Sequence, residues 1–210
     1  MMGIATETNY PYQSATDFLS QVDSDWARLI AVVGPCLLDA ELEQDPYESL
    51  VRAVAYQQLH GKAAEAITRR MLALYADQFP QPAQLVATEF DQLRACGFSA
   101  RKIETIQGIA SAAMNGVVPI RQEAEGMSND ELITRLVSLK GIGRWTVEML
   151  LIFTLGRLDV LPADDFGVKD GYKRLKLLDA PPTSKEITLL GQAWSPYRSI
   201  AAWYLWRVPR

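Results

Sequence analysis

Apolar side chains recur three and four residues apart in segment after segment of this 210-residue chain, and this spacing limits its fold more than any other feature. Stripes of this kind cover residues 50–55, 63–74 and 132–139, and the stretch 144–155 is apolar almost all round. Residues at this spacing share one face of a helix, whereas the strict alternation typical of strands is nearly absent. We therefore predict an all-α fold, with the helix at 144–155 in the centre of the molecule.

Composition excludes several classes of protein. The chain is 49% hydrophobic, which is enough to bury a core, and no apolar stretch is long enough to span a bilayer. The opening residues lack a signal-peptide pattern, so we expect an intracellular protein with no membrane partner. Two cysteines and one histidine are too few for a disulfide scaffold, a zinc site or a non-haem iron site. No metal cofactor is expected.

The stretch LKGIGRWTVEML, residues 139–150, predicts a tight turn between two helices. Gly141 and Gly143 can both adopt positive φ, and such a turn presents backbone N–H groups where the next helix begins. The positive end of a helix dipole suits a phosphate, and Lys140 and Arg144 add charge on either side. The same pattern is also typical of an ordinary helix connection, so phosphate binding is a hypothesis at this point.

Five phrases in the same order resemble the helix-hairpin-helix DNA glycosylase superfamily, and within it the 3-methyladenine DNA glycosylase II branch that removes alkylated bases. They are SLVRAVAYQQLHGKAA, GFSARKIETIQGIA, LKGIGRWTVEMLL, LPADDFGVKDGY and WSPYRSIAAWYLW, and the resemblance covers most of the chain. It implies a two-lobed helical fold with a cleft between the lobes, into which a base is flipped from the DNA stack. The chain has no room for the N-terminal β domain of well-known bacterial relatives, so it resembles the compact members.

On this basis residues 1–210 form a single compact glycosylase unit. Its contiguous lobe is expected at 46–165 and carries the helix-hairpin-helix at about 130–155. The second lobe combines residues 1–45 with residues 166–210. We expect a monomer that acts in the cytoplasm or at the nucleoid, because one lesion is read by one cleft.

The resemblance assigns the chemistry to Asp165. Cleavage of an N-glycosidic bond places positive charge on the sugar, and a carboxylate stabilises that charge or orients the attacking water. Asp165 falls at the position of the family's catalytic aspartate, while Asp164 is expected to orient the loop or face solvent. An aspartate here is also typical of a helix N-cap, and the two roles are compatible.

Trp145 stands where the branches that also cut the DNA strand carry a lysine that attacks the sugar. We therefore predict a monofunctional enzyme that leaves an abasic site. An indole face attracts a cationic alkylated base, so Trp145 is predicted to form a pocket wall. By the same resemblance Trp206 is a pocket residue, and Tyr204 or Trp203 lies nearby; the alternative is that these aromatic residues pack a terminal helix.

The phrase YQQLHG resembles the element that fills the gap left by a flipped nucleotide. Gln58 falls at the plugging position, Gln57 at its edge, and His60 is predicted to touch the minor groove or to lie at a helix start on the surface. Lys102, together with Arg101 and Arg198, is predicted to bind phosphate, although solvated surface charge is the usual state of such residues. These groups would concentrate positive charge on one face despite a formal net charge of -4.

The predicted function is thus a base-excision repair glycosylase for 3-methyladenine and 7-methylguanine in double-stranded DNA, without a cofactor except a structural monovalent ion that the hairpin allows. Hypoxanthine and etheno-adenine remain as alternative lesions. A non-enzymatic helix-hairpin-helix module is the main alternative, but it needs neither Asp165 nor an aromatic pocket. A strand-cutting glycosylase needs the lysine that is missing beside the hairpin.

Overall fold

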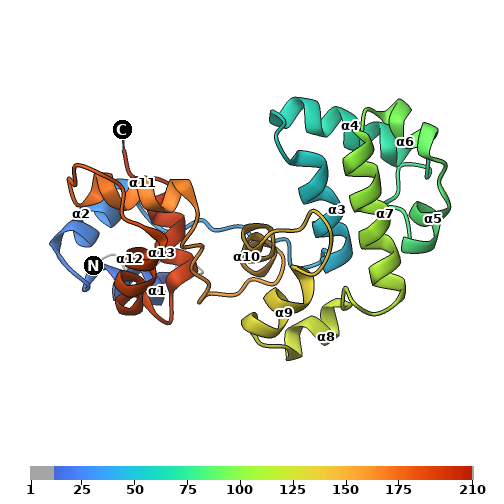
Figure 1. Cartoon of the computed structure of the whole chain (residues 1–210). Coiled ribbons are helices and arrows are strands. Elements are labelled where there is room, and N and C mark those ends of the chain that lie inside the picture. The colour runs from blue at the N-terminus through green and yellow to red at the C-terminus, as the bar shows by residue number, and fades with distance from the viewer. Residues whose placement is uncertain (1–11, 210) are drawn as a thin grey trace, which may run out of the picture. The chain divides into compact units, whose positions relative to one another are not determined.

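A computed structural model describes residues 12–209, and every regular element within this range is a helix (Figure 1). The all-α prediction is therefore confirmed for this part of the chain. The contacts divide the chain into two units. Unit 2 is the continuous segment Ala40–Gly156, whereas unit 1 combines the residues up to Asp39 with those from Arg157 onward.

These boundaries differ from the 46–165 lobe predicted from the sequence. The Glu41 amide donates to the Phe153 carbonyl at 2.8 Å, which joins the segment before the third helix to unit 2. On the other side, Ser199 Oγ donates to the Arg157 carbonyl at 2.6 Å, which joins the loop after residue 156 to unit 1. Asp165 consequently belongs to unit 1, and not to the contiguous segment that carries the hairpin.

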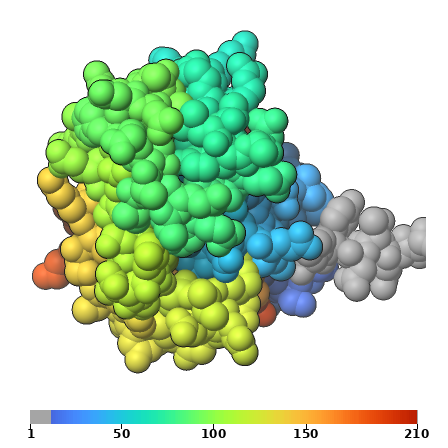
Figure 2. Space-filling model, turned by 90° about the vertical axis from the view of Figure 1, so that its right-hand side faces the viewer, coloured from blue at the N-terminus to red at the C-terminus, as the bar shows by residue number. Residues whose placement is uncertain are grey.

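Unit 2 holds eight of the described helices. They are α3 (Pro46–Tyr56), α4 (Gly61–Ala73), α5 (Pro82–Ala87), α6 (Phe90–Cys96), α7 (Ala100–Met114), α8 (Arg121–Gly126), α9 (Asn129–Leu136) and α10 (Arg144–Phe153). The longest, α7, packs against α3 and α5 and buries Ile103, Ile106 and Ile109 at helical spacing (Figure 1). Figure 2 shows the face of this unit on which α5 to α7, in green, lie above α8 and α9, in yellow-green.

Local signals explain where these helices begin and end. Ser128 caps α9 in a capping box, because its hydroxyl accepts from the Glu131 amide while the Glu131 carboxylate accepts from the Ser128 amide. Gly97 ends α6 with φ of 107°, a left-handed conformation that favours glycine. The apolar stretch at residues 144–155 contains α10, whose Val147, Leu151 and Ile152 are completely buried, as its apolar character predicts.

Unit 1 holds the remaining elements described. They are α1 (Gln13–Ser20), α2 (Ser24–Val33), α11 (Phe166–Leu175), α12 (Ser184–Leu190), a short 3₁₀ helix (Gly191–Trp194) and α13 (Arg198–Leu205). The last helical run of the sequence is divided before α13, because Pro196 cannot donate to a helical hydrogen bond. Residues 199–205 of α13 are all buried, so this helix forms the core of unit 1.

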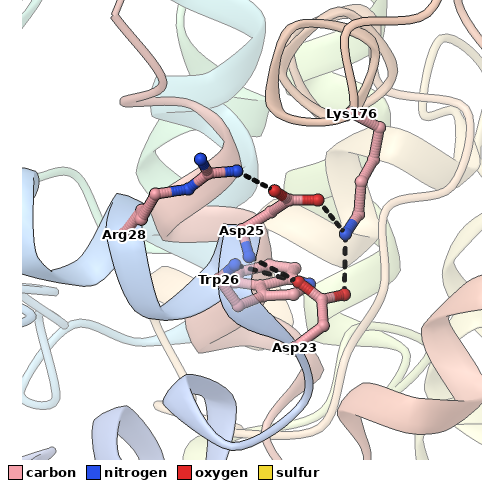
Figure 3. A network of polar contacts seen from close by, with 5 residues as sticks. All are labelled: Asp23, Asp25, Trp26, Arg28 and Lys176. Atoms are coloured by element: carbon pink, nitrogen blue, oxygen red, sulfur yellow. Dashed lines mark hydrogen bonds and ion pairs between the residues drawn. The ribbon is translucent and has the colours of Figure 1, made fainter.

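Lys176, which follows α11, links that helix to the start of α2 (Figure 3). Its Nζ lies 2.7 Å from a carboxylate oxygen of Asp23 and 2.7 Å from one of Asp25. Asp23 also caps α2 by accepting from the amides of Asp25 and Trp26, and Arg28 pairs with Asp25. The network fixes the end of α11 that lies away from Asp165.

Candidate functional site

Asp165 is the N-cap of α11, as its sequence context predicts. Its Oδ1 accepts a hydrogen bond from the Val168 amide at 2.8 Å and a second from Trp206 Nε1 at 2.8 Å. The two donors come from the first turn of α11 and from the residue that ends α13, so they fix the orientation of the carboxylate. The adjacent Asp164 is exposed and accepts from the Ser184 hydroxyl.

The loop that leads to Asp165 is held by a bidentate ion pair. Arg198 Nε lies 2.6 Å from Asp159 Oδ1, and Arg198 Nη2 lies 2.8 Å from Asp159 Oδ2. Burial raises the pKa of Asp159, but the hydrogen bonds from Arg198 and Ser195 outweigh it and hold this pKa below its usual value. Arg198 is thus paired within unit 1, where it holds the loop before Asp165, and its predicted contact with phosphate stays a prediction.

The aromatic residues at the end of α13 take different environments. Trp206 is half-buried and contacts Asp165, so the structure brings these two predicted residues together. Tyr204 is completely buried; its hydroxyl lies 3.2 Å from Thr16 Oγ1 and donates to the Gly34 carbonyl at 3.0 Å. The prediction that Tyr204 lines the base pocket is therefore wrong, because neighbours in the sequence of a helix face different sides.

Trp203 is also a core residue. It is 4% exposed, and the Arg207 guanidinium lies 3.7 Å from the centre of its ring. A cation already occupies one face of this indole. Of the aromatic residues predicted near the base on α13, only Trp206 has the exposure for that role.

In unit 2 the hairpin has the predicted turn, but only one of its two glycines is left-handed. Gly141 has φ of 85°, and a Cβ there would lie 2.7 Å from Thr105 Oγ1. Gly143 has φ of −94° and ψ of 165°, which is extended backbone that any residue adopts, and it is the N-cap of α10. The expectation of positive φ at Gly143 is therefore corrected; the open space around its Cα leaves room for a ligand to approach.

The charged residues beside the hairpin are exposed but paired. Lys140 Nζ lies 2.7 Å from Glu104 Oε2, and this pair lies in solvent, where ion pairs contribute little. Arg144 Nε lies 2.9 Å from Glu148 Oε1 one turn further along α10, and 58% of the Arg144 side chain remains exposed. Each of these two cations can therefore leave its carboxylate partner to bind a phosphate, or contact the carboxylate and the phosphate together.

Trp145 lines a pocket of about 380 Å³ in unit 2. Tyr56, Gln57, Gln58 and Met149 line the same pocket, and 48% of Trp145 is exposed. The structure thus places the predicted pocket wall beside the predicted plugging element. The volume lies within the ~300–1,000 Å³ typical of small-molecule sites.

Sequence reasoning missed four residues that line this pocket, which are Ala53, Tyr56, Thr146 and Met149. Tyr56 is 41% exposed, which is unusual for the apolar end of a helix, and Met149 is one turn after Trp145 on α10. The signal for Met149 was its helical spacing from Trp145, since residues four apart share a face. Tyr56 could have been found from its position directly before Gln57.

The turn after α3 presents its side chains to solvent. Gln58 is exposed and left-handed, with φ of 56°, and Leu59 beside it is 40% exposed. Gln57 Nε2 donates to the Gly141 carbonyl at 3.4 Å, which links this turn to the hairpin. His60 is exposed and is the N-cap residue of α4, without a side-chain cap, so it lies at a helix start on the surface.

Lys102 does not point into solvent as a phosphate contact would. Its Nζ donates to the carbonyls of Ala55 and Gln57, each at 2.8 Å. Burial of the ammonium lowers the pKa of Lys102. Two of the three donors of this ammonium are used within unit 2, which differs from the exposed phosphate contact predicted from the sequence.

Among residues 12–209 no group of three or more His, Cys, Asp or Glu side chains is arranged to hold a metal ion. No helix in the same range has the length and apolar character needed to cross a membrane. Cys36 and Cys96 are both buried, and burial raises the pKa of the Cys36 thiol to about 11. Neither thiol is poised as a nucleophile.

Two proteins of Schizosaccharomyces pombe are similar in sequence. DNA-3-methyladenine glycosylase 1 is 48% identical over 91% of this chain and 85% of its own length. Alkylbase DNA glycosidase-like protein mag2 is 41% identical over 95% of this chain and 94% of its own length. Both relatives therefore match the chain over nearly their whole lengths.

Solved structures agree with these matches. The 3-methyladenine DNA glycosylase of the same yeast, in complex with abasic DNA, has a TM-score of 0.83 at 47% identity and covers 93% of this chain and 96% of its own. DNA-3-methyladenine glycosidase of Bacillus halodurans has a TM-score of 0.83 at 34% identity, with 99% and 92% covered. The model of the HhH-GPD superfamily matches residues 51–196. The chain belongs to the HhH-GPD superfamily of base excision DNA repair proteins.

Proposed function

We propose that this protein is a monofunctional DNA glycosylase that removes alkylated purines, of the 3-methyladenine and 7-methylguanine class, from double-stranded DNA. The observation that carries the proposal is the Asp165 carboxylate, held at the start of α11 by Val168 and Trp206. The similarity to DNA-3-methyladenine glycosylase 1, at 48% identity, supports the choice of lesion.

In the proposed reaction the bond between C1′ of the sugar and the alkylated base breaks. Its electron pair goes to the base, which is cationic before cleavage and leaves neutral, so no acid is needed to protonate it. Asp165 stabilises the positive charge that develops on the sugar, since a preoriented carboxylate acts without reorganisation. Water adds to C1′ and gives up a proton, and the product is an abasic site.

Unit 2 contributes the recognition groups in this proposal. Trp145 attracts the cationic base through its indole face, and Gln58 fills the space that the base leaves in the stack. The amides at the start of α10, with Lys140 and Arg144, bind a backbone phosphate. Because Trp145 stands in place of a lysine, no Schiff base forms and the strand stays intact.

No cofactor takes part in this reaction. The hairpin carbonyls of Leu139 and Gly141 accept from Ile142 N and Gln57 Nε2, and each carbonyl oxygen keeps a second lone pair. They therefore fit a monovalent cation, whose charge would help to neutralise a phosphate. We further propose that the protein is a monomer and acts inside the cell, in the cytoplasm or at the nucleoid.

The experiment is base release from randomly methylated duplex DNA, with strand breaks measured before and after alkali. Asp165→Asn keeps an N-cap oxygen for the Val168 amide and removes only the charge. The matched control is Asp164→Asn, which changes the exposed neighbour. Methylpurine release by the wild type and by the control, abolished in Asp165→Asn and with breaks only after alkali, supports the proposal. Binding without any release by the wild type favours a non-enzymatic DNA-binding module.

A further inference from the structure

The first turn of α7 reaches across to the end of α3 through one side chain. Lys102 lies in that turn, and its Nζ donates to the Ala55 and Gln57 carbonyls at 2.8 Å each. Figure 1 shows α3 and α7 side by side, and the two helices pack together within unit 2. Lys102 therefore joins two helices at the point where the chain leaves α3 for the turn that carries Gln58.

The last carbonyl groups of a helix need partners from outside its own ladder. At this end of α3 the carbonyls of Ala53 and Val54 accept from the Gln57 amide. The Tyr56 carbonyl accepts from the Leu59 amide. The Ala55 and Gln57 carbonyls accept from the Lys102 ammonium. A cation here also interacts favourably with the negative end of the helix dipole.

The contact at the Gln57 carbonyl restricts the conformation of the next residue. That carbonyl belongs to the peptide plane between Gln57 and Gln58, and fixing the orientation of this plane restricts φ of Gln58. Gln58 has φ of 56°, a left-handed conformation that residues other than glycine adopt only where their surroundings hold them. Lys102 holds this peptide plane through its hydrogen bond to the Gln57 carbonyl.

The same helix supports the hairpin. Thr105, one turn after Lys102 on α7, lies under Gly141, where a Cβ would come within 2.7 Å of its Oγ1. Gln57 Nε2 donates to the Gly141 carbonyl at 3.4 Å, so the turn and the hairpin are also linked directly. One face of α7 thus supports both loops that the proposed function places against DNA.

We propose that Lys102 is a positioning residue, which anchors the Gln57 carbonyl and thereby aims the Gln58 side chain into the DNA stack. The proposal rests on the proposed function, because it needs Gln58 to fill the gap left by a flipped base. It differs from a phosphate contact, in which the ammonium would bind DNA itself. Burial, which lowers the pKa of Lys102, supports an internal role.

A double-mutant cycle tests whether Lys102 acts through Gln58. The single-turnover rate of base release is measured for the wild type, Lys102→Met, Gln58→Ala and the double variant. We expect Lys102→Met to lower this rate about ten- to a hundredfold, as misplaced groups do. In the Gln58→Ala background the same change should have less than about a threefold effect, because coupled residues are non-additive. If Lys102→Met lowers the rate by the same factor in the wild type and in the Gln58→Ala background, the proposal is overturned.

Salt dependence separates positioning from phosphate binding. Binding to duplex DNA with a tetrahydrofuran abasic analogue is measured by fluorescence anisotropy over a range of KCl concentrations. Removal of a phosphate contact reduces the slope of log K against log salt by about 0.9. We expect that reduction for Lys140→Met and no change of slope for Lys102→Met. A reduced slope for Lys102→Met overturns the proposal.

A conservative variant controls for folding. Lys102→Arg keeps N–H donors for both carbonyls, and we expect base release within about threefold of the wild type. If Lys102→Met does not fold, Lys102→Gln replaces it in the cycle, because its amide retains donors. Absence of base release by the wild type itself would reject the proposed function, whereas release with an additive cycle rejects only the role of Lys102.

Discussion

Trp206 donates a hydrogen bond from its indole Nε1 to Asp165 Oδ1 at 2.8 Å, across a sequence separation of 41 residues. The oxygen that accepts this bond also accepts the Val168 amide that begins α11. The carboxylate is therefore oriented by a backbone group of one helix and a side chain from the end of another. Loss of either donor leaves the negative charge of Asp165 in place but lets the carboxylate rotate more freely.

Trp206→Phe is expected to lower kcat about tenfold with little change in KM, because Phe keeps an aromatic ring but has no N–H to donate to Asp165. The free energy of unfolding should fall by about 1 kcal/mol, the usual net contribution of such a bond. Steady-state kinetics and urea denaturation provide the two measurements.

Tyr204→Phe is the matched control on the same helix. It should also lower the free energy of unfolding by about 1 kcal/mol, because the Gly34 carbonyl loses a buried donor. Its kcat should equal that of the wild type. A lower kcat for Tyr204→Phe would mean that Tyr204 contributes to the base pocket after all.

Gly167→Ala tests the space between Trp206 and Asp165. A Cβ at this position would lie 2.7 Å from Trp206 Cδ1 and 3.1 Å from Asp165 Oδ1, so the two side chains must separate. We expect base release to slow about tenfold or more, although alanine favours a helix by ~1 kcal/mol over glycine.

Gly108→Ala makes the same substitution inside α7, where an added Cβ meets nothing within 4 Å. It should raise the free energy of unfolding by up to ~1 kcal/mol and leave base release unchanged. Thermal unfolding and single-turnover assays of the two variants give the comparison. Equal rates for both would show that the contact between Trp206 and Asp165 does not limit the reaction.

Gly141→Ala is expected to lower the free energy of unfolding by about 2 kcal/mol, because φ of 85° and the contact with Thr105 both oppose a Cβ. At Gly143 neither the backbone conformation nor a close contact opposes a Cβ. Gly143→Ala should therefore lower the free energy of unfolding by only about 0.5–1 kcal/mol, because alanine is a weaker N-cap residue than glycine. Its binding to abasic-site DNA should nevertheless weaken, since the methyl group occupies the approach to the α10 amides. Urea denaturation and anisotropy measure the two effects, and unchanged DNA binding by Gly143→Ala would place the phosphate elsewhere.

Lys176 makes part of the stability depend on pH. Burial raises the pKa of Asp23, but hydrogen bonds from Lys176 and the α2 amides outweigh it, and the Lys176 hydrogen bond lowers the pKa of Asp25. Burial lowers the pKa of Lys176, but its two carboxylate partners raise it overall. Lowered carboxylate pKa values contribute stability above about pH 4 that is lost as the pH falls, and a raised lysine pKa contributes stability that is lost above about pH 10.5.

Lys176→Met should therefore lower the Tm between about pH 5 and pH 10, with the difference from the wild type shrinking below about pH 4. Lys185→Met, at an exposed position of α12, is the control and should leave the Tm unchanged at every pH. Scanning calorimetry across pH measures both. A difference that persists unchanged at pH 2 would mean that the loss comes from packing of the lysine stem.

The helical class could be predicted because the evidence for it is local. The three stripes at residues 50–55, 63–74 and 132–139 fall on α3, α4 and α9, where burial repeats with the helix period. The hairpin was found for the same reason, since Gly141 lies within a few residues of the helices that it joins. Family-like phrases then indicated Asp165, whose N-cap position the structure bears out.

The errors arose where partners are distant in sequence. Lys102 looks like a solvated charge until the carbonyls that it binds, 45 and 47 residues earlier, are known. Tyr204 and Trp206 are two residues apart, so they face different sides of α13, and composition alone does not say which side is the core. The hydrogen bond from Trp206 to Asp165 has no local signature at all.

The continuity of unit 2 orders events during biosynthesis. Domains fold as units from the N-terminus as the chain leaves the ribosome, so residues 40–156 can complete their core first. Unit 1 needs helices from before and after that segment, and Asp165 meets Trp206 only when most of the chain has emerged. A nascent or truncated chain that ends before Trp206 can therefore complete unit 2 but lacks the hydrogen bond that orients the Asp165 carboxylate, and the proposed function predicts that such a chain releases no base.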